Sequence, residues 1–90
     1  MDKAVVTLVG MDSVGIIAKM CTYFAENDVN IIDIAQTTVR GIINMVMIVD
    51  LGTGSKGFDN VKNDMDNISK NVKCVINIVK YDDLEALAEE

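Results

Sequence analysis

The stretch of sequence that decides the fold is residues 29–51, which read VNIIDIAQTTVRGIINMVMIVDL. Both halves are rich in β-branched residues, and the glycine at position 41 stands between them. Apolar runs of this kind are typical of strands, and a glycine between two such runs is typical of a tight turn. The sequence therefore predicts a β-hairpin made of strands 29–40 and 42–51.

Helical patterns lie on both sides of this hairpin. The helix before it is expected to end at Asn27-Asp28, with Asp12 or Ser13 able to cap its N-terminus. Apolar residues spaced at i, i+3, i+4 and i+7 form its buried stripe, namely Ile17, Met20, Cys21 and Phe24. The helix after the hairpin covers residues 58–70, and its stripe consists of Phe58, Val61, Met65 and Ile68.

Two further strands complete the pattern. Residues 4–9 and 73–81 are short apolar runs, and residues 82–90 form an acidic tail that is expected to be a short helix. The order is βαββαβ, which right-handed crossovers turn into a ferredoxin-like α+β sandwich. We expect one domain over residues 1–90, with its core at about 4–81. Its four-stranded antiparallel sheet should have the order 4-1-3-2, with two helices on one face.

The third and fourth strands are apolar on both faces, whereas a sheet with one face in water alternates apolar and polar residues. One face holds Ile43, Met45, Met47, Val49, Cys74, Ile76 and Ile78. The other face holds Val46, Ile48, Val75, Val79 and Tyr81. Because two helices cover only one face, the second should be covered by the tail helix, by a partner chain, or by both.

The second strand is expected to bind another copy of the chain. In a sheet of this order residues 29–40 form an edge strand, and Arg40 is their only basic residue. The segment contains no proline, so little protects it against pairing with another strand. We therefore expect a homodimer or a larger homo-oligomer, with the edge strands joined about a two-fold axis.

The composition argues against several classes of function. The formal net charge is -6 and the eight basic residues are scattered, which disfavours nucleic acids and anionic membranes as partners. The chain has no histidine, and Cys21 and Cys74 are too far apart in sequence for a metal motif. No pair of nucleophile and base is visible, so neither catalysis nor a cofactor is expected. Without a signal-peptide core or a long apolar run, the chain is expected to be cytoplasmic.

Two motifs resemble those of the ACT domain family. Residues 10–16, GMDSVGI, resemble the first turn of that family, and residues 29–34, VNIIDI, resemble its entry into the second strand. Residues 35–37 continue the match. The similarity covers residues 4–81 and is closest to small stand-alone ACT proteins, relatives of the glycine-cleavage repressor type. One departure is Val14, where many members carry proline.

This resemblance implies a ligand site between the first turn of one subunit and the second strand of its neighbour. The implied ligand-binding residues are Gly10, Asp12, Val14, Gly15, Asn30 and Ile31. Glycines let the backbone approach a ligand closely, and amides at the start of a helix attract a carboxylate. Asp12 or Asn30 can accept a hydrogen bond from an ammonium group, so the set fits a zwitterion such as an amino acid.

Structural roles for the same residues stay open beside the ligand role. Asp12 can cap the helix, Gly15 can serve helix–sheet packing, and Asn30 can close the turn before its strand. The expected function is a regulatory, non-catalytic module that binds a small molecule, an amino acid by this chemistry, at a subunit interface. The alternative is a dimeric protein–protein interaction module that acts on a regulated protein and whose ligand site is vestigial.

Overall fold

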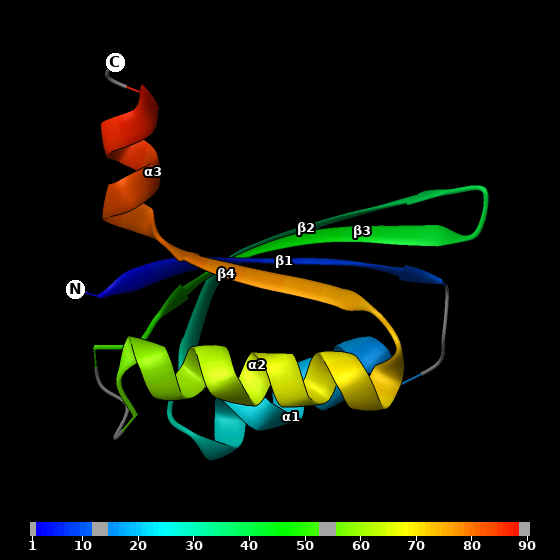
Figure 1. Ribbon diagram of the computed structural model, residues 1–90, viewed down its shortest axis with the longest axis horizontal. Coiled ribbons are helices and arrows are strands. Elements are labelled where there is room, and N and C mark those ends of the chain that lie inside the picture. The colour runs from blue at the N-terminus through cyan, green and yellow to red at the C-terminus, as the bar shows by residue number, and fades with distance from the viewer. Residues whose placement is uncertain (1, 12–14, 53–55, 89–90) are drawn as a thin grey trace.

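The fold is a four-stranded sheet backed by two helices, with a third helix at one end (Figure 1). The computed structural model describes residues 2–11, 15–52 and 56–88. Along the chain the elements are β1 Lys3–Met11, α1 Ile16–Glu26, β2 Asn30–Val39, β3 Ile42–Asp50, α2 Phe58–Val72, β4 Val75–Lys80 and α3 Tyr81–Ala88. This order confirms the predicted βαββαβ pattern with a tail helix.

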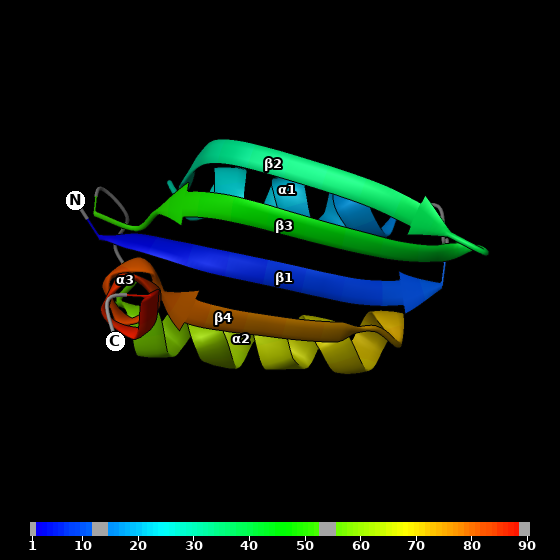
Figure 2. The same cartoon turned by 90° about the horizontal axis from the view of Figure 1, so that it is seen from above.

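The sheet has the strand order β2-β3-β1-β4, and each neighbouring pair is antiparallel. Helices α1 and α2 lie on the same face of this sheet, as Figures 1 and 2 show. The predicted strand order and the predicted ferredoxin-like sandwich are therefore confirmed. β2 lies at one edge of the sheet, as the sequence predicts for the second strand.

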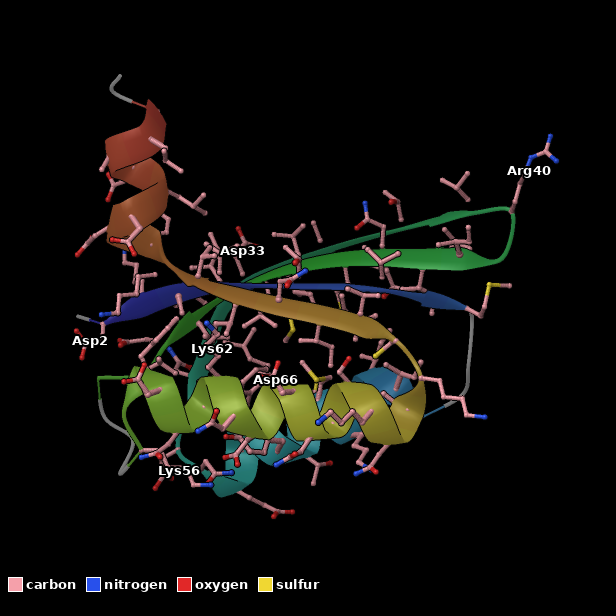
Figure 3. All side chains as sticks on the ribbon, viewed as in Figure 1. Asp2, Asp33, Arg40, Lys56, Lys62 and Asp66 are labelled. Atoms are coloured by element: carbon pink, nitrogen blue, oxygen red, sulfur yellow. The ribbon has the colours of Figure 1, made fainter. Side chains whose placement is uncertain are left out.

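A two-residue turn joins β2 to β3. Val39 pairs with Ile42, and the two residues between them, Arg40 and Gly41, have φ angles of 50° and 79°. Two consecutive positive φ angles are the mark of a type I′ turn, whose twist matches that of the strands it joins. The predicted hairpin is therefore confirmed. Arg40 projects from its tip, away from the rest of the chain (Figure 3).

The core lies between the sheet and the two helices. The residues predicted for the inner face of β3 are all buried, namely Ile43, Met45, Met47 and Val49. α2 buries Val61, Met65 and Ile68, with Phe58 half-buried at the margin. In α1 the buried residues are Ile16, Met20 and Phe24. Ile17 and Cys21 are only half-buried, so the stripe of α1 is centred slightly away from the predicted one.

Helix α3 begins one residue earlier than the sequence predicts. The apolar pattern places Tyr81 at the end of the last strand, but β4 ends at Lys80 and Tyr81 starts the helix. Asp82 and Asp83 stand in the first turn, where the helix dipole favours carboxylates. The ammonium group of Lys3 lies 5.0 Å from the Tyr81 ring centroid, a cation–π contact that ties the start of α3 to β1.

The face of the sheet opposite α1 and α2 is uncovered, and we call it the open face. It consists of the alternate residues that point away from these helices, from Val5 to Met11 on β1, Ala35 to Val39 on β2, Ile42 to Ile48 on β3 and Val75 to Val79 on β4. α3 rises from this side at one end only, and none of its described residues is buried (Figure 1). Of the covers that the sequence leaves open, the tail helix alone does not suffice, because it stands over one end of this face.

Candidate ligand-binding site

The two described glycines of the first turn meet different structural requirements. Gly10 lies near the end of β1, where an added Cβ atom would sit 2.8 Å from the Cβ of Cys74. Gly15 holds the N-cap position of α1 with a φ of 103°, a conformation that side chains rarely adopt. No atom of the described residues lies within 4 Å of a Cβ built on Gly15, so its backbone conformation, not helix–sheet packing, is what requires glycine there.

The start of α1 presents backbone amides that no side chain of the described residues caps. The Lys19 amide donates to the Gly15 carbonyl oxygen at 2.8 Å, and the amides before Lys19 have no partner within the helix. Gly15, rather than Asp12 or Ser13, holds the N-cap position. Asp12 and Val14, which the sequence predicts as ligand-binding residues, lie outside the described residues, as does Ser13. The described part of this turn therefore offers hydrogen-bond donors to an anionic group.

The tight turn at the end of α1 determines where Asn30, the second half of the candidate site, lies. Asp28 adopts a φ of 57°, and the amide of Val29 donates to the Phe24 carbonyl oxygen at 2.9 Å. This is the hydrogen-bond pattern of a Schellman motif, and it confirms that the helix ends at Asn27-Asp28. Val29 and Phe24 are buried, so the direction in which the chain enters β2 at Asn30 is fixed.

Asn30 and Ile31 open β2 at the end of the sheet remote from Gly10. Asn30 is exposed and pairs with Asp50, and Ile31 is half-buried. The pairing shifts register between Ile31 and Asp33, which leaves one extra residue on β2 as a bulge. Figure 2 shows β2 curving in this region. The bulge bends the edge strand beside the polar side chain of Asn30.

A single chain does not bring the two halves of the candidate site together. Gly10 pairs with Ile43 near one end of β3, whereas Asn30 pairs with Asp50 at the other end. Seven residue steps along β3 separate these levels, a distance of roughly 23 Å along the strand. Because no amino acid spans that distance, a site that uses both Gly10 and Asn30 requires two chains.

A polar cluster links α1 to α2, and no motif in the sequence predicts it. The Tyr23 hydroxyl donates to Asp64 Oδ2 at 2.6 Å, and Lys56 Nζ donates to the same oxygen atom at 2.6 Å. Lys56 Nζ also lies 5.7 Å from the centroid of the Tyr23 ring. Tyr23 and Asp64 are 41 positions apart in sequence, so only the packing of the helices joins them.

The ionisation of this cluster indicates a structural clamp. Hydrogen bonds from Lys56 and Tyr23 hold the pKa of the Asp64 carboxyl below its ordinary value. Burial, together with the hydrogen bond to Asp64, raises the pKa of Tyr23. Asp64 therefore stays ionised and Tyr23 protonated near neutral pH. Neither group is poised to exchange a proton there, so the cluster offers no general base.

Cys74 belongs to the packing of the first turn. It is buried beneath Gly10, and the Ser69 hydroxyl donates to its carbonyl oxygen. Burial raises the pKa of its thiol, which lowers the fraction of reactive thiolate. Cys74 and Cys21 are both free cysteines, and Cys74 packs as a small buried hydrophobe, whereas Cys21 is half-buried.

A cavity of about 540 Å³ lies away from the candidate site, between the start of α2 and the junction of β4 with α3. Its charged lining residues are Asp2, Lys3, Lys56, Asp59, Lys80 and Asp82. Three positive and three negative side chains give this lining no net charge. Neither Gly10, Gly15, Asn30 nor Ile31 lines the cavity, so it does not supply the predicted site.

Two classes of site find no support in residues 2–11, 15–52 and 56–88. No three His, Cys, Asp or Glu side chains there are grouped so that they could hold a metal ion. No helix in these segments is long and apolar enough to cross a membrane. What the described residues of the candidate site offer to a ligand is backbone amides and the amide side chain of Asn30.

The strand order and the two helices on one face define a ferredoxin-like α+β domain, and comparison with known proteins gives the family. Residues 2–78 match the family model of the ACT domain. The chain is 44% identical over 78 residues to a UPF0237 protein of Bifidobacterium longum, and the match covers 82% of this chain and 87% of that protein. The chain belongs to the ACT domain family, whose members are regulatory ligand-binding modules.

Solved structures agree with this assignment. An ACT domain protein from Streptococcus pneumoniae is 30% identical, with a TM-score of 0.77 over 88% of this chain and 89% of that chain. The ACT domain from GTP pyrophosphokinase of Chlorobium tepidum has a TM-score of 0.63 at 21% identity, over 88% of this chain and 100% of that one. The second likeness shows the shared fold alone. The resemblance carried by residues 10–16 and 29–34 is therefore confirmed.

Proposed function

We propose that the chain is a non-catalytic regulatory module that binds an amino acid between two copies of itself. The observation that carries the proposal is the placement of the amides at the start of α1, which no described side chain caps, at one end of the sheet and of Asn30 at the other. β1 and β2 both run antiparallel to β3, so they run parallel to each other. A two-fold axis that joins β2 to the β2 of a second copy reverses the second strand. Asn30 of that copy then approaches the end of the sheet where Gly15 lies.

The edge strand supports this pairing. β2 lies at the edge of the sheet, contains no proline, and is exposed at every residue except the half-buried Ile31. An unprotected edge presents unpaired N–H and C=O groups, which a second strand satisfies. Pairing of two β2 strands joins the two sheets into one of eight strands.

The chemistry of the two halves complements the charges of an amino acid. Its carboxylate accepts hydrogen bonds from the amides near Val14 and Gly15, where the helix dipole also favours negative charge. Its ammonium group donates to Asp12 or to the side-chain oxygen of Asn30 from the other copy. Gly10 and Ile31 form the adjoining walls of this site.

Calorimetric titration with amino acids tests the proposal. The proteins compared are the native chain, Asp12→Ala and Asn30→Ala, with Asn67→Ala on the exposed surface of α2 as the matched control. Loss of one charge-assisted hydrogen bond should weaken binding by roughly tenfold to a hundredfold, or about 1.5–3 kcal/mol. If an amino acid binds and neither site variant weakens it, the site lies elsewhere.

The open face favours a second function, that of a protein–protein interaction module. Val9, Val46 and Val79 are each at least 40% exposed there, which is typical of a surface that meets another protein. In this alternative the ligand site is vestigial and the output is contact with a regulated protein. The titration decides between the two functions, because the interaction module becomes the favoured function if no amino acid binds below millimolar concentration.

The proposed location is the cytoplasm. Cys21 and Cys74 are free, as is usual in a reducing compartment. The net charge of -6 also makes nucleic acids and anionic membranes unfavourable partners. Cell fractionation with an antibody against the chain tests the location, and recovery in the membrane or secreted fraction would contradict it.

A further inference from the structure

The open face of the sheet is free of charge over most of its area. Strand register places Lys3, Asp33 and Asp50 on this side, and all three stand at the end where α3 rises. Figure 3 shows Asp33 toward that end. Over the remainder, the residues that face outward are apolar or carry only hydroxyl and amide groups. A sheet face that stays in water normally carries charged and polar residues. The uncharged, largely apolar composition of the open face therefore indicates contact with another surface.

Exposure of apolar side chains is greatest at the end remote from α3. Met11 and Val75 are 65% and 59% exposed at that end, whereas Val79, close to α3, is 40% exposed. α3 itself adds Leu84 and Leu87, which are 40% and 63% exposed. Both leucines line a hollow at the β4 edge, between α3 and the Phe58 and Lys62 side chains of α2. One end of the molecule thus has exposed leucines on the helix that rises from the open side, and the other has an apolar surface without cover.

We propose that the open face binds the open face of a second copy of this chain, about a two-fold axis that lies across the strands. Such an axis reverses the strand direction of the second copy. α3 of each copy then lies over the end of the partner sheet that is remote from the partner's own α3. Leu84 and Leu87 of one copy thereby cover Met11 and Val75 of the other.

The length of α3 fits this arrangement. Its eight residues span about 12 Å, and stacked sheets lie about 10 Å apart. α3 points away from α1 and α2 on the open side of the sheet, as Figure 1 shows. A helix of this length therefore reaches across the gap between two stacked sheets and contacts the rim of the second one.

The area of the face is also sufficient. Four strands about 4.8 Å apart and about eight residues long make a face of roughly 19 Å by 26 Å, or on the order of 500 Å² for each chain. Two copies together bury on the order of 1,000 Å², which is near the lower limit for a specific interface. Stacking of two edge-paired dimers doubles this contact and brings it to the usual size of a stable one.

A second copy fits the face better than other occupants. An anionic membrane would require basic residues, and Lys3 is the only one that faces outward among the described residues of this face. The central rows are uncharged, so two identical faces meet there without repulsion between like charges. This inference goes beyond the β2 pairing proposed above and does not depend on it. With both contacts present, two eight-stranded sheets stack and the assembly closes at four chains.

A charge-pair exchange tests the contact. We compare Val75→Lys, Leu87→Glu and the double variant by sedimentation equilibrium, with Thr22→Lys on the exposed side of α1 as control. Each single variant places one charge in an apolar contact and should weaken the face-to-face step at least about tenfold. The double variant places opposite charges across the contact and should recover most of that loss. Within one chain Val75 is the first residue of β4 and Leu87 lies in α3 beyond the other end of that strand, so the recovery cannot arise inside a single copy.

Hydrogen exchange separates this contact from the pairing of β2 strands. Pairing at the edge protects amides of β2, whereas stacking of the open faces leaves them unprotected. The expected native assembly has four copies, and Val75→Lys reduces it to two with β2 still protected. A native dimer that Val75→Lys dissociates, with β2 unprotected, supports the stacked face and overturns the proposed edge pairing.

Two results would overturn the face-to-face contact. One is an assembly whose size neither Val75→Lys nor Leu87→Glu changes, which would show that the open face binds a different partner. The other is a double variant as weak as the single ones, which would show that α3 does not meet Val75 of the second copy. Circular dichroism checks that each variant is folded, and Val9→Lys replaces Val75→Lys if that variant does not fold.

Discussion

Lys73 adopts a left-handed backbone conformation at the end of α2, with φ of 54° and ψ of 52°. A side chain in this region costs about 1–2 kcal/mol, whereas glycine adopts it freely. We expect Lys73→Gly to raise the free energy of unfolding by about 0.5–1 kcal/mol, because the greater freedom of glycine in the unfolded chain offsets part of the gain. Urea denaturation measures the change. Lys70→Gly, in the last turn of the same helix, should instead lower the free energy by about 1 kcal/mol.

Gly10 is the residue whose packing leaves least room for change. An alanine there would place its Cβ 2.8 Å from the Cβ of Cys74, which is buried and close to the backbone. Gly10→Ala should therefore lower the free energy of unfolding by about 1–3 kcal/mol. Because the clash is with Cβ, Cys74→Gly should rescue Gly10→Ala in a double-mutant cycle, whereas Cys74→Ala should not. Additive effects of Gly10→Ala and Cys74→Gly would show that this contact is not the cause.

At the scale of elements, the clamp between α1 and α2 makes stability depend on pH. The folded chain holds the pKa of Asp64 below its unfolded value, so the clamp contributes fully above the unfolded pKa. That contribution is lost as pH falls through the folded pKa. Thermal unfolding between neutral and acidic pH should therefore show a smaller acid-induced drop in Asp64→Asn than in the native chain. Asp66→Asn, exposed on the same helix, should retain the native pH profile, and identical profiles for all three proteins would rule out the clamp.

The elements themselves could be predicted because their signals are local. The apolar, β-branched runs of residues 29–40 and 42–51 and the glycine at position 41 determine the hairpin, and periodic stripes determine both helices. What the sequence does not predict correctly depends on interactions that the apolar pattern of a single element does not encode. The aspartates after Tyr81 favour a helix start over one more strand residue. The contact of Tyr23 with Asp64 depends on how two helices pack, and that information is spread over the whole core.

At the scale of the whole molecule, the candidate site could be predicted only as two separate halves. The glycine at position 15 and the polar residue at position 30 can be read from the sequence, and the structure adds the reason for Gly15, its φ of 103°. Their separation follows from strand register, which places Gly10 and Asn30 at opposite ends of β3. Whether they share a ligand depends on a second chain, whose position no single-chain pattern contains. The proposed function therefore depends on the assembly of two chains.

A ligand held between two chains must alter their association. An amino acid that binds only the β2-paired dimer stabilises it by mass action, and by reciprocity the dimer binds the amino acid more tightly than one chain does. At a ligand concentration about a hundred times the dissociation constant, each occupied site should tighten the dimer by about a hundredfold. Sedimentation equilibrium with and without the amino acid measures this shift. Asn30→Ala should reduce it and Asn67→Ala should not. An amino acid that binds but leaves the dissociation constant of the dimer unchanged would lie within one chain. Gly10 and Asn30 are separated by roughly 23 Å along the strands, so such a site would not contain both.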